Sequence, residues 1–199
     1  TEALWLGRAL VELMPDEPEA HGLLAMMMLH DSRREARFRE GELVLLGDQD
    51  RSLWDGAQIA GGQAVLQRAL ALRERGPYVV QAEIASLHTA ELRDWVRIAA
   101  LYAELAQLTG SDVVELNRAV AVAEAEGPEA GLRIVDRLRL EDYRYLHSTR
   151  GELLRRLGRT QEAGDAYHRA LKLTHDSAER RWLARRLAEL TTGTDRGEK

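Results

Sequence analysis

The densest group of side chains able to do chemistry lies between His30 and Asp55, where charged and amide residues gather around one tryptophan. Arginine forks match carboxylates in a bidentate geometry, so one interpretation is an internal network that holds this segment onto neighbouring helices. The other interpretation is a docking face for a protein, in which an exposed tryptophan beside arginine would be the anchor. The candidate surface consists of Asp31, Arg33, Arg34, Arg37, Asp48, Gln49, Asp50, Arg51, Trp54 and Asp55.

The spacing of Asp48, Asp50 and Asp55 invites comparison with a calcium-binding loop. Such a loop requires glycine at its sixth position and glutamate at its twelfth, but Leu53 and Ile59 stand there. The sequence also lacks His-Glu-x-x-His, a phosphate-binding glycine-rich loop and Gly-x-Ser-x-Gly. We therefore expect no catalytic residues, no metal and no cofactor, and we expect the aspartates to form ordinary helix caps and ion pairs.

The composition limits the possible partners. The 199 residues carry a net charge of -5 and contain no cysteine. Because a free-standing DNA-binding domain usually has a basic face, this chain is not expected to bind nucleic acid directly. The absence of cysteine fits the cytoplasm, and no apolar run is long enough to cross a bilayer. The chain starts without methionine inside an expected helix, which suggests that an N-terminal part has been removed.

An internal repeat of 33 residues indicates how the chain is organised. Residues 129–138 and 162–171 each begin with Glu-Ala-Gly, followed by a large apolar residue and a leucine at the same spacing. A period of this size marks stacked helix pairs. Two fainter copies consist of Ile98, Tyr102 and Leu105, and of Gly62, Leu66, Ala69 and Leu70.

Glycine and proline punctuation divides the sequence into about ten helices. We expect an all-α protein, an irregular stack of antiparallel helix pairs (an α-solenoid), as a single domain over residues 1–190. Residues 31–52 form an irregular excursion with a short strand or extended loop, and residues 191–199 form a disordered tail. Ser52 is expected to cap the helix after the excursion. The expected helices cover residues 2–14, 16–30, 52–75, 77–89, 92–108, 112–126, 128–139, 143–157, 160–173 and 177–190.

Residues 145–175 resemble a tetratricopeptide repeat, in which small residues let two helices cross closely and large residues fill the groove between them. The matching positions are Gly151, Leu154, Gly158, Ala163, Tyr167 and Ala170. His147 and His175 depart from the pattern, standing where the repeat often has Trp and Pro. Asn117 begins an Asn-Arg-Ala run that is found in many such repeats. The resemblance implies a tetratricopeptide-like stack, with a candidate groove at Asn117 and His147.

A succession of short runs along the whole chain resembles the C-terminal extension of a group of extracytoplasmic-function (ECF) RNA polymerase sigma factors that carry a tetratricopeptide-like domain. The runs are Leu-Met-Pro-Asp-Glu-Pro-Glu (13–19), Gly-Leu-Leu-Ala (22–25), Leu-His-Asp-Ser-Arg-Arg (29–34), Ala-Arg (36–37), Asp-Gln-Asp-Arg-Ser (48–52), Trp-Asp (54–55), Leu-Asn-Arg-Ala-Val-Ala-Val-Ala (116–123) and Leu-Leu-Arg-Arg-Leu-Gly-Arg (153–159). The resemblance implies that the sigma domains, which read the promoter and bind RNA polymerase, precede Thr1.

We therefore expect a regulatory, non-catalytic domain that acts in transcription initiation in the cytoplasm. Its expected partners are its own N-terminal sigma domains and RNA polymerase, with no direct contact to nucleic acid or membrane. One alternative is a stand-alone tetratricopeptide-type scaffold that binds a protein or peptide. Another is an enzyme or ligand-binding pocket within the curve of the helices. A copurifying peptide would favour the scaffold, and an occupied polar pocket would favour the ligand site.

Overall fold

The computed structural model describes residues 2–72 and 74–194, and the regular secondary structure of this part is helical apart from one short hairpin. Its ten α-helices pack as neighbouring pairs, which confirms the expected all-α class and helix number for the described residues. The contacts divide the chain into two compact units. Unit 1 comprises the described residues of 1–37 and 44–110, and unit 2 comprises those of 38–43 and 111–199. The prediction of one domain over residues 1–190 stays a prediction.

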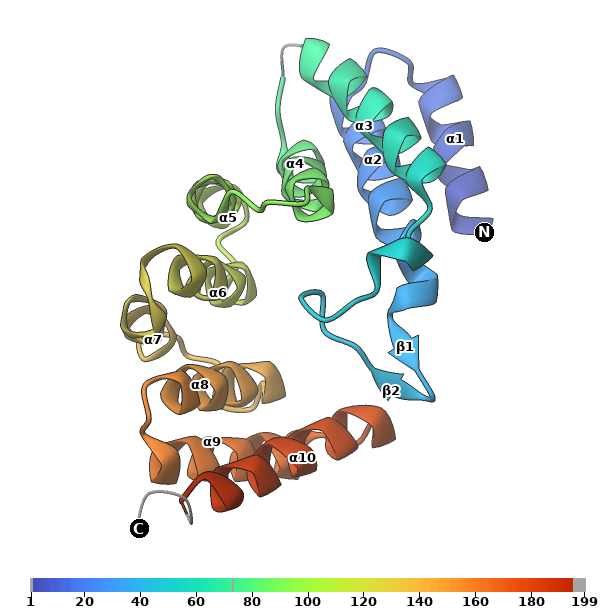
Figure 1. The fold of residues 1–199 in the computed structure, drawn as a ribbon. Coiled ribbons are helices and arrows are strands. Elements are labelled where there is room, and N and C mark those ends of the chain that lie inside the picture. Colours follow the sequence, from blue (N-terminus) through green and yellow to red (C-terminus); the bar gives the residue numbers. More distant parts are fainter. Residues whose placement is uncertain (1, 73, 195–199) are drawn as a thin grey trace. The chain divides into compact units, whose positions relative to one another are not determined.

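Unit 1 is arranged around α2, which packs against α1, α3 and α4 (Figure 1). A Cβ on Gly22 would lie 2.6 Å from the backbone nitrogen of Val79, so α2 and α4 cross with their backbones in contact. A Cβ on Gly62 would lie 3.0 Å from the Leu29 side chain, so α3 packs closely on the side chains of α2. The elements are α1 (Glu2–Leu13), α2 (Pro18–Asp31), the 3-10 turns η1 (Arg34–Ala36) and η2 (Arg51–Leu53), α3 (Gly56–Ala71), α4 (Pro77–Thr89) and α5 (Trp95–Thr109).

The first turn of α4 is capped by a carboxylate from another helix. Glu19, in the first turn of α2, accepts hydrogen bonds from the backbone nitrogens of Gly76 (3.2 Å), Tyr78 (2.8 Å) and Val79 (3.0 Å). Three of the amides exposed at a helix start are therefore satisfied by one side chain, whose charge also suits the positive end of the helix dipole. This contact fixes where α4 begins relative to α2.

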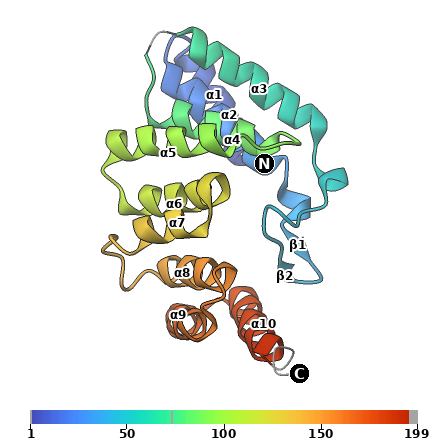
Figure 2. The ribbon, with the colours of Figure 1, turned by 60° about the vertical axis from the view of Figure 1, so that its left-hand side comes forward.

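Unit 2 consists of two helix pairs and a last helix, α10, which packs against α9 (Figure 2). Its largest fully buried side chain is Tyr167, whose ring lies against Gly151. A Cβ on Gly151 would lie 2.7 Å from that ring, so only glycine permits this crossing of the two helices. The helices are α6 (Asp112–Glu126), α7 (Pro128–Val135), α8 (Arg144–Arg156), α9 (Thr160–Leu173) and α10 (Ser177–Thr194).

The hairpin of strands β1 (Phe38–Arg39) and β2 (Glu42–Leu43) belongs by its contacts to unit 2. The strands are antiparallel, and the turn between them places Glu40 and Gly41 at positive φ. Arg181 of α10 donates a hydrogen bond to the Gly41 carbonyl (2.8 Å), and Arg185 forms an ion pair with Glu42. The expected short strand is thus one half of a hairpin.

The internal repeat corresponds to one position in every helix pair. Its copies lie in α3, α5, α7 and α9, which are the second helices of the pairs α2–α3, α4–α5, α6–α7 and α8–α9. The small residue of each strong copy, Ala130 or Ala163, is buried. The repeat therefore records the packing of each second helix onto its first.

The helix after the excursion starts later than expected. Residues 51–53 form η2, with Asp50 accepting from the Ser52 nitrogen at 2.9 Å. Asp55 caps α3 by accepting from the Gln58 nitrogen at 2.9 Å. The expectation that Ser52 caps this helix is therefore wrong, because two aspartates compete for the same stretch and the second one caps the helix.

Three other boundaries differ from the sequence expectation. α3 ends at Ala71, before the expected residue 75. α5 begins at Trp95 because Asp94 caps it, accepting from the Arg97 nitrogen at 2.9 Å. α7 ends at Val135, before the expected residue 139, and the chain beyond it lets Leu138 and Leu140 pack onto the unit 2 core.

The end of α10 lies beyond the expected end at residue 190. The helix continues to Thr194, so the expected disordered tail is wrong for its first four residues. Neither threonine nor one glycine stops a helix outright, since glycine costs only about 1 kcal/mol relative to alanine. Residues 195–199 of the predicted tail lie outside the described residues.

Candidate functional site

The ten residues of the candidate surface lie in the segment between α2 and α3, all within unit 1. Ser32 makes two hydrogen bonds at the base of this segment, and the one with Asp55 closes it. The Asp55 nitrogen donates to the Ser32 carbonyl at 2.9 Å, and the Ser32 hydroxyl donates to the Leu29 carbonyl at 2.8 Å. The helix ends on either side are thus tied together, and the intervening residues form a loop with a fixed base.

Trp54 lies between two arginines. The guanidinium carbon of Arg51 is 4.4 Å from the ring centroid, and that of Arg33 is 5.6 Å away. Cations within about 6 Å of an indole face are attracted by its quadrupole. The Trp54 side chain is only 9% exposed, so the exposed tryptophan anchor expected for a docking face is not present.

Arg51 also binds the C-terminal end of α4. Its Nη2 donates to the Thr89 carbonyl at 2.6 Å and its Nη1 to the Ala90 carbonyl at 3.2 Å. A cation at this end satisfies carbonyls without helical partners and suits the negative end of the dipole. Together with the Trp54 contact, this makes Arg51 a structural pin between the loop and α4.

Arg33 is buried, with 6% of its surface exposed. Its Nη2 lies 3.1 Å from Nδ1 of His30, and Arg37 donates to the His30 carbonyl at 3.0 Å. Neither arginine forms an ion pair with a carboxylate among the described residues. An Arg33 hydrogen bond to Nδ1 requires that nitrogen to be the acceptor, so His30 is neutral with its proton on Nε2.

Positive charge accumulates around Arg33. Burial, followed by the charges of Arg37 and Arg93, lowers the pKa of Arg33 to about 10. Burial, with Arg33 and Arg93 nearby, lowers the pKa of His88 to about 4. Burial, followed by the charges of Arg33 and Arg37, likewise lowers the pKa of His30 to about 4. Both histidines are therefore neutral at pH 7, and Arg33 stays charged.

The remaining candidate residues form the outer part of the loop. Arg34 pairs with Glu35 at 2.9 Å and with Asp31 at 3.9 Å. Asp31 also accepts a hydrogen bond from Gln58 at 3.0 Å. The Asp48 side chain is exposed and forms no hydrogen bond or ion pair with a described residue. Gln49, by contrast, turns inward and donates to the Val44 carbonyl at 3.3 Å.

Several residues of this cluster come from the end of α4 and the start of α5 and were not identified in the sequence. His88 contacts Trp95 edge-on, with ring centroids 5.7 Å apart. Arg93 lies 5.9 Å from the Trp95 centroid and donates to the Leu46 carbonyl at 3.3 Å. Burial raises the pKa of Tyr102 nearby. These residues lie about forty positions further along the chain, and no local spacing signals their approach to the loop.

The candidate groove residues Asn117 and His147 both lie in unit 2. The Asn117 side chain is exposed on α6. His147 is 8% exposed, and its Nε2 lies 2.7 Å from the Glu141 carbonyl. His147 therefore fastens the connection before α8, and only Asn117 faces solvent.

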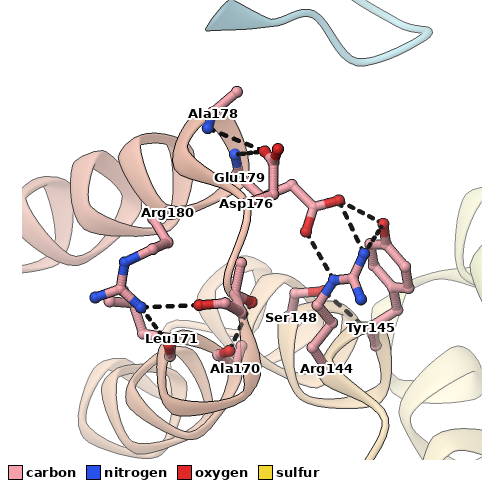
Figure 3. A network of polar contacts seen from close by, with 10 residues as sticks. Arg144, Tyr145, Ser148, Ala170, Leu171, Asp176, Ala178, Glu179 and Arg180 are labelled. Carbon is pink, nitrogen blue, oxygen red and sulfur yellow. Dashed lines mark hydrogen bonds and ion pairs between the residues drawn. The ribbon is translucent and has the colours of Figure 1, made fainter.

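A second polar network, also not identified in the sequence, joins α8 to α10 in unit 2 (Figure 3). Arg144 and Tyr145 both point toward Glu179, and the Arg144 Nε lies 2.7 Å from the Glu179 carboxylate. Asp176 caps α10, and Arg180 donates to the carbonyl of Thr174 at 2.9 Å. Each charge here has a partner, so the network stabilises helix contacts.

The arrangement offers no clear metal site. Across the described residues, no group of three or more His, Asp or Glu side chains is placed to hold a metal ion. Asp50 and Asp55 cap different helical turns, and Asp48 points to solvent, which is why the three do not converge. None of the helices in the described part of the chain has the length and apolar character that a membrane crossing requires.

The candidate surface lies wholly within a region that is shared with other proteins. Residues 1–70 match a family of unknown function (DUF6596). Nearly the whole chain is similar to an uncharacterized protein of Rhizobium meliloti (strain 1021), with 45% identity over 196 residues, which is 95% of this chain and 46% of that protein. The chain thus spans about half the length of the curated relative it matches.

Proposed function

We propose that this chain is a regulatory, non-catalytic domain of an alternative RNA polymerase sigma factor of the extracytoplasmic-function type. It acts in transcription initiation by contacting its own sigma domains or RNA polymerase. The succession of runs from 13–19 to 153–159 supports this proposal through its resemblance to such extensions. The relative of about twice the length supports a domain that works within a longer protein.

The observation that carries the proposal is the division of the unit 1 loop into an inner and an outer part. Arg51 and Trp54 hold the loop in one conformation, while Arg34 and Asp48 stay exposed on it. A fixed loop presenting opposite charges suits a protein surface, because complementary charges set the register of a contact and its rate of formation. Regulation then requires that the contact favours one of two states of the sigma domains.

The test is promoter-dependent transcription with purified RNA polymerase and the full-length protein. Arg34→Glu and Asp48→Lys reverse charges whose loss costs little folding energy, since surface substitutions of this kind change stability by about 0.5 kcal/mol or less. We expect both variants to keep their melting temperature and to lose transcription. Asp165→Lys, on an exposed face of α9, is the matched control. Full activity in both loop variants would exclude the loop as the contact surface.

A second test concerns DNA. The chain is acidic, and phosphate contacts normally supply much of the affinity for DNA. We expect no sequence-specific gel shift with promoter DNA by this chain alone at physiological salt, and a shift by the full-length protein with RNA polymerase. A specific shift by the isolated chain would contradict the proposal that the sigma domains, and not this chain, bind promoter DNA.

The alternative function, a tetratricopeptide-type scaffold for a protein or peptide, is favoured by the exposed Asn117 on α6. The scaffold function predicts the opposite order of variant effects in the transcription assay. Asn117→Ala would then abolish the regulatory effect while Asp48→Lys would leave it unchanged, and both proteins would remain folded.

A further inference from the structure

Arg33 is buried, and its guanidinium is only partly paired. It forms no ion pair with a described carboxylate, and its Nε has no hydrogen-bond partner. The indole Nε1 of Trp54, in the same cluster, also lacks an acceptor. Gln49 Oε1 and His88 Nδ1 of this cluster lack partners too, but neither carries a negative charge that could balance Arg33. Buried donors of this kind are usually paired, so a charged acceptor would complete the cluster.

The charges around Arg33 also indicate that a negatively charged acceptor is required. A buried cation without a counter-ion is costly, and Arg33 nevertheless remains protonated at pH 7. Its one hydrogen-bond partner is the neutral ring of His30, which supplies a lone pair but no charge. Arg37, beside it, is exposed and likewise forms no ion pair with a described carboxylate. An anion would provide both the charge and the lone pairs.

We infer that Arg33 is the centre of a binding site for one oxyanion, either a carboxylate or a phosphoryl group. The planar guanidinium fork matches both groups in a bidentate geometry. The Trp54 indole N–H is the second donor, and Arg37 is the cation at the exposed edge. The His30 ring occupies the place of the acceptor in the unliganded chain, and its exposed side lets it turn toward solvent when the anion enters.

This site does not depend on the proposed role in transcription and is tested on the chain itself. The probes are acetate, which reproduces an aspartate or glutamate side chain, and inorganic phosphate, with chloride at matched ionic strength as the control. At a hundredfold excess over its dissociation constant, the bound anion should raise the melting temperature by about 5 °C or more. A response to acetate alone assigns a protein carboxylate, and a response to phosphate alone assigns a phosphoryl group. Equal responses to all three salts would overturn the inference.

Arg33→Met tests the residue, because methionine keeps much of the side-chain length and removes the charge. This variant should melt at the wild-type temperature or higher in anion-free buffer, and it should not respond to either probe. Arg155→Met is the matched control, since Arg155 forms an ion pair with Glu152 in unit 2. That control should melt at a lower temperature and keep the full anion response. An Arg33→Met protein that still responds to the probes would overturn the site.

A spectroscopic measurement covers the case in which Arg33→Met does not fold. In a nitrogen-15 spectrum, the indole N–H signal of Trp54, assigned with Trp54→Phe, should shift as the probe is added. The signal of Trp182, in unit 2, should not move. Arg33→Lys keeps the charge but loses the fork, and it should weaken the probe at least tenfold. Immobility of the Trp54 signal, or unchanged affinity in Arg33→Lys, would count decisively against an anion at Arg33.

Discussion

Two arginines in the loop of unit 1 are held in a different way from the arginines that join the helices of unit 2. In unit 2, Arg144 meets Glu179 at 2.7 Å and Arg156 meets Glu124 at 2.6 Å, in each case between helices of the stack. In the loop of unit 1, Arg33 and Arg51 contact an indole ring instead, together with backbone carbonyls or a neutral histidine. A repeated stack brings opposite charges together at a regular spacing. The irregular loop has no such repeat, and Arg51 depends on carbonyls 38 and 39 positions further along the chain.

The comparison implies that packing dominates the stability of unit 2, and the largest expected effect tests this. Tyr167→Ala removes a fully buried ring and its hydrogen bond to Glu152, and should lower the free energy of unfolding by about 3–5 kcal/mol. Urea unfolding gives the value, and hydrogen exchange should place the loss in unit 2. Tyr145→Ala, at an exposed position of α8, is the control and should cost far less.

The second prediction concerns the polar cluster of unit 1 and its response to acid. The pKa of His88 is about 4 in the folded protein and 6.5 in the unfolded chain. Above pH 6.5 the His88 ring is neutral in both states. Between pH 6.5 and pH 4 it is protonated in the unfolded chain but stays neutral in the folded protein. The contribution of His88 to stability should therefore fall between pH 6.5 and pH 4, by at most about 3 kcal/mol. His30 has the same pKa shift, so His88→Gln should reduce the slope of this part of the profile by about half. Identical profiles for the two proteins would contradict the assignment.

The pin formed by Arg51 should have a smaller but clear effect. Arg51→Ala removes two charge-assisted hydrogen bonds to the end of α4 and one contact with Trp54, at a cost of about 2 kcal/mol. Its measurement is urea unfolding followed by hydrogen exchange in residues 31–55. Arg34→Ala, on the outer part of the same loop, is the control. Equal stability of the two variants would mean that Arg51 does not hold the loop.

The smallest expected effect is the loss of a helix cap, which should lower stability equally in both units. Asp94 caps α5 in unit 1, and Asp176 caps α10 in unit 2. Replacing either by alanine should cost about 1 kcal/mol, because a cap satisfies the same backbone amides wherever the helix lies. A difference well above 1 kcal/mol in chemical denaturation would show that one cap has a further role.

Much of the fold follows from the sequence because its signals are local. The repeat at 129–138 and 162–171 predicted stacked helix pairs, and glycine or proline marked most helix ends. The start of α3 was wrong because two local signals compete there. Asp50 and Asp55 both precede helical turns, and only the folded chain shows which one caps α3.

The candidate site was predicted only in part. Its residue types and their position in the chain were apparent, and the internal network was one of two stated interpretations. The burial of Trp54 was not apparent, because it depends on Arg51 reaching carbonyls at residues 89 and 90. The approach of His88 and Arg93 to the loop was not apparent either, because the end of α4 reaches the loop only in the folded unit.

The sequence by itself determined the all-α class, the pairing of helices and the place where the stack is interrupted, because periodicity and helix stops act over one or two turns. Only the tertiary structure decided which charges are compensated. Asp31, a carboxylate close in sequence, does not pair with Arg33, whereas a neutral histidine does. Whether a buried cation finds a partner depends on the directions of side chains from separate helices, and no spacing along the chain encodes those directions.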